Sequence, residues 1–94
     1  MYGIAFEWDR LKDSNRRKHR VGFGEASTVF GAPFSITISD PDYATDEERF
    51  LIIGMSRNRS LLVVVHTIRG ECIRLISARS ATKEERRNYE ENAR

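Results

Sequence analysis

Residues 61–79, LLVVVHTIRGECIRLISAR, constrain the fold more strongly than any other part of the chain. Aliphatic and β-branched residues lie on both sides of Gly70, and three consecutive valines precede His66. This pattern is typical of two β-strands joined by a tight turn. The sequence therefore predicts a β-hairpin with strands at about 60–68 and 71–79.

Hydrophobic periodicity predicts how the rest of the chain is arranged around this hairpin. Ile4, Phe6 and Trp8 alternate with smaller or polar residues, which indicates a first strand. Thr82 and Glu85 form a T-x-x-E capping box that begins a last helix. The other expected elements are helices at about 10–20 and 25–30 and strands at about 33–39 and 48–56. Short connections between the later strands predict an α+β fold: an antiparallel twisted sheet of about four to five strands, with two N-terminal helices on one face and a C-terminal helix.

The composition favours a small protein with a thin core. The 94 residues are 39% hydrophobic and 32% charged, which suits one domain, residues 1–94, with a partner contributing to its stability. Cys72 is the only cysteine, so no internal disulfide can form and a reducing compartment is expected. The N-terminus shows no signal-peptide pattern, and no apolar run approaches the roughly 20 residues of a membrane span. We therefore expect a cytoplasmic protein.

Basic residues are unevenly distributed along the chain. Residues 1–20 carry six Lys or Arg against three acids, residues 21–50 carry one against six, and residues 51–94 carry nine against five. Two basic segments that flank an acidic one are typical of proteins that bind nucleic acid. The cations near the end of the first helix are also explained by the helix macrodipole. Charge alone therefore leaves nucleic-acid binding and an ordinary solvated surface as alternatives.

The position of Gly70 predicts the register of the last hairpin. A three-residue loop at 68–70, with Gly70 in the left-handed position, would pair Val64 with Arg74. Directly opposed residues share a face of the sheet. His66 and Arg74 are therefore expected on the same face.

The preceding hairpin adds a second arginine to this expected cluster. A two-residue loop at 58–59 would bring Arg49 close to His66. Arg79 has the opposite parity to Arg74, but it stands at the end of its strand, where its direction is free. The predicted cluster is therefore Arg49, His66 and Arg74 with Arg79 nearby, and a slip of one residue in either loop would divide it between two faces.

Such a cluster without a set of metal ligands indicates a phosphate site. One Cys and two His are too few for a zinc site, and neither a nucleotide P-loop nor a G-x-S-x-G nucleophile motif occurs. The alternative is structural, because a histidine at a strand end is often only packed or exposed. Arginines in half-exposed strands usually lay their stems on apolar neighbours and keep their heads in water.

Four short motifs, in order along the chain, resemble a known family. They are F-E-W-D at 6–9, Lys18-His19, V-V-H-T at 64–67, and I-S-A-R at 76–79 followed by A-T and by E-R-R-x-Y-E at 85–90. From about Phe6 to Glu91, nearly the whole chain, the sequence resembles the BrnT toxins. It departs from them at Arg10, where the family often has Pro, and at Arg20, where it commonly has Gly. The second departure removes a glycine suited to ending the first helix.

The resemblance implies a fold, an activity and a partner. BrnT proteins are toxins of type II toxin–antitoxin pairs with a RelE-like fold, and they arrest growth by cutting RNA. Their antitoxin, BrnA, is a small ribbon-helix-helix DNA-binding protein that neutralises the toxin, and the complex represses its own operon. By this resemblance we expect a RelE-like sheet, an RNA substrate, a BrnA-like antitoxin, and operator DNA contacted through the complex.

RNA can be cut without a metal or a cofactor because its own 2′-hydroxyl is the nucleophile. Histidine ordinarily titrates near pH 6.5, so His66 could act as base or acid, and Arg49, Arg74 and Arg79 could hold the phosphate. Contacts to the RNA are expected from the basic helix, from Lys12, Arg16, Lys18 and His19. The alternative from another class is a non-catalytic interaction module, a co-repressor subunit of a DNA-binding complex, whose half-apolar sheet face and lean last helix contact a protein partner.

Overall fold

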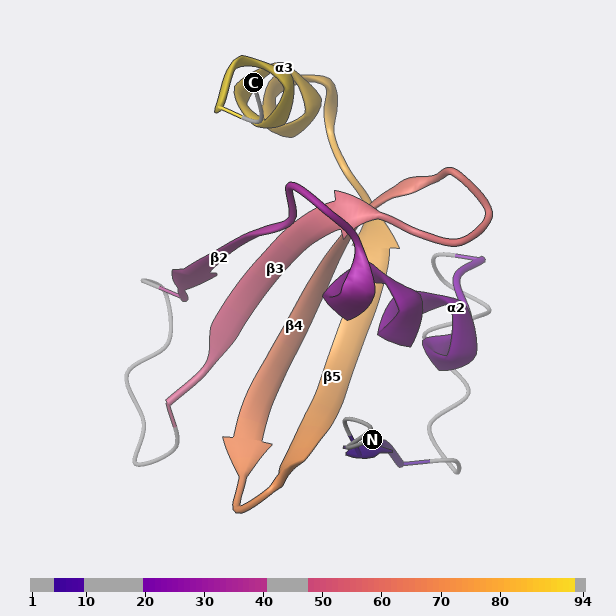
Figure 1. Cartoon of the computed structure of the whole chain (residues 1–94), viewed down its shortest axis with the longest axis vertical. Helices are drawn as coiled ribbons and strands as arrows, with labels where there is room; N and C mark the ends of the chain where they lie inside the picture. The colour runs from indigo at the N-terminus through magenta and orange to yellow at the C-terminus, as the bar shows by residue number, and fades with distance from the viewer. Residues whose placement is uncertain (1–4, 10–19, 41–47, 93–94) are drawn as a thin grey trace.

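The computed structural model describes residues 5–9, 20–40 and 48–92, which form a five-stranded sheet with short helices against it. The elements are β1 (Ala5–Glu7), α2 (Phe23–Ser27), the 3-10 helix η1 (Thr28–Gly31), β2 (Ile36–Ser39), β3 (Phe50–Met55), β4 (Leu61–Arg69), β5 (Cys72–Ser80) and α3 (Lys83–Asn92). Figure 1 shows α2 and η1 in front of the sheet and α3 beyond the end at which β5 terminates. The α+β class and the C-terminal helix are confirmed. The helix expected at 25–30 is divided between α2 and η1, and the one expected at 10–20 falls almost wholly outside the described residues.

The strand order is β1-β5-β4-β3-β2, with β1 and β2 at the edges. Strands β2 to β5 pair antiparallel as a meander. Strand β1 pairs parallel to β5, so the prediction of a wholly antiparallel sheet is wrong at this strand. A tight hairpin imposes the antiparallel direction on its second strand, whereas β1 is joined to β5 only through a long stretch of chain, which permits a parallel pair.

The hairpin between β3 and β4 has a three-residue loop where the sequence predicted a two-residue loop. The Ser56 N–H donates to the Ser60 carbonyl at 2.8 Å, and the Arg59 N–H donates to the Ser56 carbonyl at 2.9 Å. Arg59 has a φ of 64°, so an arginine takes the left-handed position that glycine usually fills in such loops. This loop shifts the register by one residue and places Phe50 opposite His66.

The hairpin between β4 and β5 differs from the prediction in the opposite sense. Arg69 pairs with Cys72, which leaves a two-residue loop, Gly70-Glu71. Gly70 has a φ of 59°, which fits the first central position of a type II′ turn. The predicted loop lengths of the two hairpins are therefore exchanged. A glycine with positive φ suits either kind of loop, so Gly70 does not select one of them.

A β-bulge in β5 changes which residues share a face. Two adjacent residues of β4, at positions 65 and 66, have partners on β5 that are two positions apart, Ser77 and Leu75, so Ile76 is the extra residue. The extra residue reverses the alternation of side chains along β5. Arg74 and Arg79 therefore lie on the same face, although their positions have opposite parity.

One face of the sheet, here called the helical face, packs against α2 and η1. Its buried core is made of Val21, Ala26, Val29, Ile52, Leu62, Val64, Leu75 and Ala78, with Phe6, Trp8, Phe23, Phe30 and Ile73 packed around it. Gly54 lets η1 approach the sheet, since a Cβ at this position would lie 3.0 Å from Cγ1 of Val29. Ser56 Oγ donates to Oε2 of Glu25 at 2.6 Å and ties α2 to the turn between β3 and β4.

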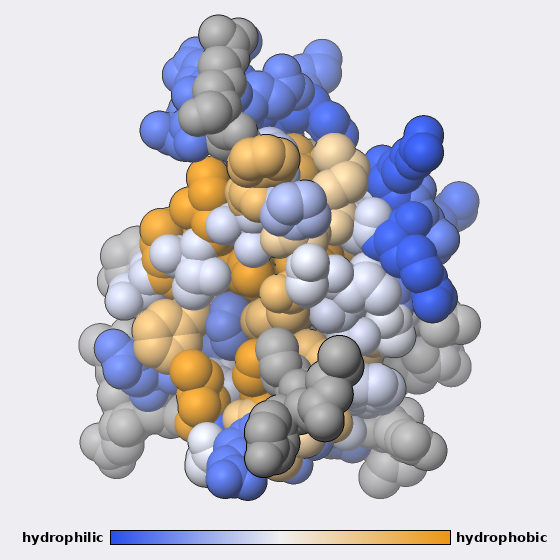
Figure 2. All heavy atoms as spheres, in the orientation of Figure 1, coloured by the Kyte–Doolittle hydropathy of each residue, from blue (hydrophilic) through white to orange (hydrophobic). Residues whose placement is uncertain are grey.

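The opposite face, here called the second face, carries Ile53, Val63, Thr67 and Arg74. Helix α3 lies over one end of this face and encloses a groove of about 220 Å³. The groove is lined by Ile36, Ile38, Leu51, Ile53 and Val63 of the sheet and by Glu85, Asn88, Tyr89 and Asn92 of α3. No residue of α3 is buried, and Figure 2 shows strongly hydrophilic residues gathered on it and around the turn between β3 and β4. In the parts of the chain that the structure describes, no helix is both long and apolar enough to cross a membrane.

Candidate functional site

Polar side chains form a row across the second face, at the end of the sheet away from α3. Glu7 on β1 pairs with Arg74 on β5, and Arg74 pairs with Thr67 on β4. Directly paired residues of neighbouring strands share a face, so the three side chains lie side by side. The register of three strands therefore brings together residues that are far apart in the sequence.

Arg49 extends this row beyond Thr67. The Arg49 carbonyl accepts from the Asp40 N–H at 2.9 Å, which continues the pairing of β2 and β3 to this residue. Thr67 Oγ1 donates to the carbonyl of the residue before Arg49 at 2.8 Å. Phe50 stacks on His66, which lies on the helical face. Strand alternation therefore directs Arg49 to the second face. Two strand spacings, roughly 10 Å, separate Arg49 from Arg74, so both long side chains can reach one phosphate.

We call Glu7, Arg74, Thr67 and Arg49 the cross-strand row. Within it, Nη1 of Arg74 lies 3.7 Å from Oε1 of Glu7, and the two side chains are 32% and 41% exposed. An exposed ion pair with one long contact contributes at most about 1 kcal/mol to stability. A guanidinium group held so loosely can move onto a phosphate, whose oxygens it binds through two parallel N–H donors. The row therefore presents a cation and a carboxylate at the surface.

Arg79 is bound instead to the start of α3. Its Nη1 and Nη2 donate to Oε1 and Oε2 of Glu85 at 2.7 and 2.9 Å. Glu85 Oε1 also accepts from the Thr82 N–H at 2.9 Å, and the Glu85 N–H donates to Thr82 Oγ1 at 3.1 Å, which confirms the predicted capping box. The Arg79 guanidinium lowers the pKa of Glu85 to about 2, and the same hydrogen bonds raise the pKa of Arg79. This pair fixes the helix in place.

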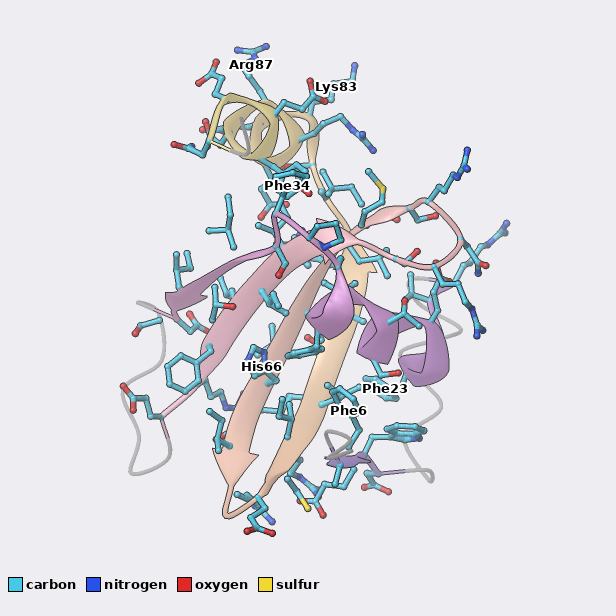
Figure 3. The ribbon with its side chains drawn as sticks, viewed as in Figure 1. Phe6, Phe23, Phe34, His66, Lys83 and Arg87 are labelled. Carbon is cyan, nitrogen blue, oxygen red and sulfur yellow. The ribbon has the colours of Figure 1, made fainter. Side chains whose placement is uncertain are left out.

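His66 lies on the helical face and is buried, with 4% of its surface exposed. The ring of Phe30 meets it edge-on at a centroid distance of 4.7 Å, and the ring of Phe50 stacks on it at 5.8 Å. Its Nδ1 donates to the Val64 carbonyl at 3.3 Å. Burial lowers the pKa of His66 below 6.5, and the hydrogen bond to Val64 opposes this effect. Figure 3 shows the imidazole on the face that also carries Phe6.

The predicted convergence of Arg49, His66 and Arg74 on one face is therefore wrong for His66. The loops of both hairpins differ in length from those expected, and the register of each shifts accordingly. Thr67, not His66, stands between the two arginines. Arg79 joins the face of Arg74 through the bulge, but it is held there by Glu85.

Two members of the row, Thr67 and Glu7, were not predicted from the sequence. Thr67 takes the position expected for His66, and Glu7 comes from a strand far away in the sequence. Its contact with Arg74 depends on the parallel pairing of β1 with β5, which no local pattern indicates. The available signal was the F-E-W-D motif at 6–9, in which Glu7 alternates with two aromatic residues. Four expected RNA contacts lie outside the described residues: Lys12, Arg16, Lys18 and His19.

An α+β protein whose sheet carries Arg49 and Arg74 on the same face is of a class suited to binding phosphate groups. A family model described as "Ribonuclease toxin, BrnT, of type II toxin-antitoxin system" matches residues 8–85, which is most of the chain. The chain belongs to the BrnT family, as its motifs had indicated. That family consists of ribonuclease toxins of type II toxin–antitoxin systems, which implies an antitoxin partner. A search of curated protein sequences found no match.

Proposed function

We propose that the chain cuts RNA at the cross-strand row, with Arg49 and Arg74 holding the phosphate at the cleavage point. The observation that carries this proposal is the position of Arg74, partly exposed on the second face and joined to Glu7 by a single 3.7 Å contact. Family membership supports RNA as the substrate. Burial of His66 on the helical face favours the second face as the place of the reaction.

The proposed reaction is attack of an RNA 2′-hydroxyl on the adjacent phosphate, without a metal or a cofactor. Negative charge builds on the non-bridging phosphate oxygens in the transition state. Guanidinium groups already in position stabilise this charge more than they stabilise the substrate, which is the condition for a faster reaction. Loss of one such group lowers the rate by about 10²- to 10³-fold in comparable sites.

The remaining candidate residues take other places in this proposal. His66 and Arg79, expected from the sequence to be catalytic, are proposed to be structural, since one is buried between aromatic rings and the other is bound to Glu85. Basic residues before position 20 are proposed to bind the RNA backbone beyond the cleavage point. They are Lys12, Arg16, Lys18 and His19.

The test is cleavage of a defined RNA by the purified protein in the presence of EDTA. We expect cleavage to continue at an unchanged rate and to leave 2′,3′-cyclic phosphate and 5′-hydroxyl ends. Loss of cleavage in EDTA that Mg²⁺ restores would refute the metal-free reaction. Products with 5′-phosphate ends would refute attack by the 2′-hydroxyl.

We also propose the biological setting that the resemblance implies. The antitoxin is a BrnA-like ribbon-helix-helix protein, the toxin–antitoxin complex represses its own operon, and the free toxin inhibits translation and growth in the cytoplasm. Family membership supports an antitoxin partner. Operator DNA should be retarded in a gel by the complex and not by the toxin alone, and a neighbouring reading frame should encode a short ribbon-helix-helix protein.

The second candidate function is a non-catalytic co-repressor subunit of a DNA-binding complex. The observation that favours it is the apolar groove of about 220 Å³ between α3 and the second face, next to Ile38, which is 54% exposed. Such a surface suits a protein partner. Expression without an antitoxin separates the two functions. Growth arrest with loss of mRNA supports the ribonuclease, and normal growth with folded protein supports the co-repressor.

A further inference from the structure

We infer that Glu7 is the general base of the proposed RNA cleavage, the group that takes the proton from the attacking 2′-hydroxyl. The inference rests on the proposed function. Parallel pairing of β1 with β5 places Glu7 directly across from Arg74, with a carboxylate oxygen 3.7 Å from a guanidinium nitrogen. A base and a phosphate-binding cation therefore stand side by side at an exposed position.

The aromatic residues on either side of Glu7 hold it in place. Phe6 packs against Phe30 with ring centroids 5.2 Å apart, and Trp8 packs against Phe23 with ring centroids 5.9 Å apart. Both contacts belong to the core of the helical face. Because they anchor the chain before and after Glu7, strand alternation directs the carboxylate to the second face. A three-residue edge strand is thereby rigid enough to position a reacting group.

Two other ionisable residues, Glu85 and His66, are not available for this role. Both carboxylate oxygens of Glu85 accept hydrogen bonds from Arg79, and the residue caps α3. His66 is buried on the helical face. Glu7 is 41% exposed, and its 3.7 Å contact with Arg74 is too long for a strong hydrogen bond. Its carboxylate is therefore accessible to a substrate hydroxyl.

The carboxylate and the guanidinium of this pair suit two neighbouring groups of RNA, the 2′-hydroxyl and the 3′-phosphate. In a ribonucleotide the 2′-hydroxyl stands next to the 3′-phosphate that it attacks. When the guanidinium of Arg74 moves onto the non-bridging oxygens of that phosphate, the carboxylate of Glu7 is left beside O2′. One ion pair of the free protein thus separates into a base and an oxyanion-stabilising group, each with its own target.

The cleavage step needs only the RNA, Glu7, the arginines and solvent. The O2′–H bond breaks and its proton passes to the Glu7 carboxylate, while O2′ forms a bond to phosphorus. The bond from phosphorus to O5′ breaks with its electron pair, and O5′ takes a proton from solvent. Glu7 then returns its proton to solvent. The products are a 2′,3′-cyclic phosphate and a 5′-hydroxyl end.

The experiment compares the full-length wild-type protein, Glu7→Gln and Glu7→Asp in steady-state cleavage of one oligoribonucleotide at a single neutral pH. We expect Glu7→Gln to lower kcat by about 10²-fold or more, with KM within about threefold. Glu7→Asp should have a kcat between those of the wild type and Glu7→Gln, because the carboxylate is retained but set back by one methylene.

The matched control is Glu85→Gln, which removes the α3 carboxylate that pairs with Arg79 of β5, outside the row. It should keep kcat within about threefold. Thermal unfolding of Glu7→Gln should coincide with that of the wild type. Wild-type kcat in Glu7→Gln, or a loss that falls on KM rather than on kcat, would overturn the role of Glu7 and leave the ribonuclease standing. Absence of RNA cleavage by the wild type would overturn the proposed function and this inference together.

Discussion

Arg74 and Arg79 lie on the same face of β5, and each is paired with a glutamate. The exposed fractions are similar, 32% and 41% in the Arg74–Glu7 pair and 37% and 30% in the Arg79–Glu85 pair. The contacts are not: Arg79 has two hydrogen bonds at 2.7 and 2.9 Å, whereas Arg74 has one contact at 3.7 Å. What a side chain is bound to, rather than how exposed it is, therefore decides which arginine is available to a phosphate.

The elements that supply the two glutamates explain this difference. Glu85 belongs to a capping box, in which the Thr82 N–H donates to Oε1 in addition to the hydrogen bonds from Arg79. Glu7 comes from an edge strand that fixes its direction and leaves its side chain 41% exposed. About five residues of β-strand, roughly 15 Å, separate the two arginines, so one phosphate cannot occupy both pairs. Mutations in the two pairs should therefore act independently.

The largest expected effect on RNA cleavage comes from the loosely bound pair, Arg74–Glu7. Arg74→Ala should lower RNA cleavage by about 10²- to 10³-fold, because it removes a group that stabilises charge in the transition state. Stability should change by less than about 1 kcal/mol, since the pair is exposed. Arg74→Lys should fall between, as an ammonium keeps the charge but loses the two parallel donors. Single-turnover cleavage and urea unfolding measure both quantities, and a folded Arg74→Ala protein with wild-type activity would remove the basis of the comparison.

His66 tests whether the helical face takes part in the reaction. His66→Phe should retain RNA cleavage, because the imidazole is buried away from the cross-strand row. It should also flatten the dependence of stability on pH. The pKa of His66 is lowered by burial, so below pH 6.5 the unfolded chain binds more protons than the folded one. Wild-type stability should then fall on acidification by up to about 1.4 kcal/mol per pH unit from this group.

Urea unfolding at pH 7.5 and pH 5.5 gives the measurement for His66. The wild type should lose more stability between these two values than His66→Phe does. Equal losses would mean that the histidine does not titrate differently in the folded and unfolded states. A large loss of cleavage in a folded His66→Phe protein would show that the second face does not act alone.

The tightly bound pair, Arg79–Glu85, should affect the stability of the fold and not RNA cleavage. Arg79→Ala should cost about 1 kcal/mol, a value limited by solvent screening, and cleavage should stay within about threefold of wild type. The pKa of Glu85 is about 2 in the folded protein against an ordinary value of 4.5. The contribution of the pair is therefore complete above pH 4.5 and is lost as the pH falls toward 2. Unfolding followed at pH 7 and pH 3 should show the difference between wild type and variant shrinking at pH 3, and a constant difference would contradict this assignment.

Local patterns predicted the capping box to which Glu85 belongs, but neither of the two Arg–Glu pairs. Thr82 and Glu85 are three positions apart, and a capping box needs nothing beyond that spacing and a following helix. Strand positions were also predictable, since alternation and β-branched residues reveal them. The capping box could thus be placed correctly without any knowledge of the sheet.

The cross-strand row depends on register, which local patterns did not determine. The hairpin with the left-handed Arg59 has a three-residue loop and the hairpin at Gly70 has a two-residue loop, the reverse of the lengths expected. The bulge at Ile76 then reverses which residues of β5 share a face. The face of His66 is fixed by packing against Phe30, more than 30 positions away. Glu7 required a parallel contact between the first and last strands. Such contacts follow from the packing of the whole core. Of the predicted cluster of Arg49, His66 and Arg74, therefore, only Arg49 and Arg74 lie on the same face.

The smallest expected effect isolates the cap from the ion pair. Thr82→Ala removes the hydroxyl that accepts the Glu85 N–H and should cost about 0.5–1 kcal/mol, whereas Thr82→Ser should be nearly neutral. Because Arg79 and Thr82 both bind Glu85, the double variant Arg79→Ala/Thr82→Ala should deviate from additivity by about 0.5 kcal/mol or more. Arg74→Ala combined with Thr82→Ala shares no partner and should be additive within that limit. Urea unfolding of the six proteins completes both cycles, and coupling of about 0.5 kcal/mol or more between Arg74 and Thr82 would show that the two Arg–Glu pairs are not independent.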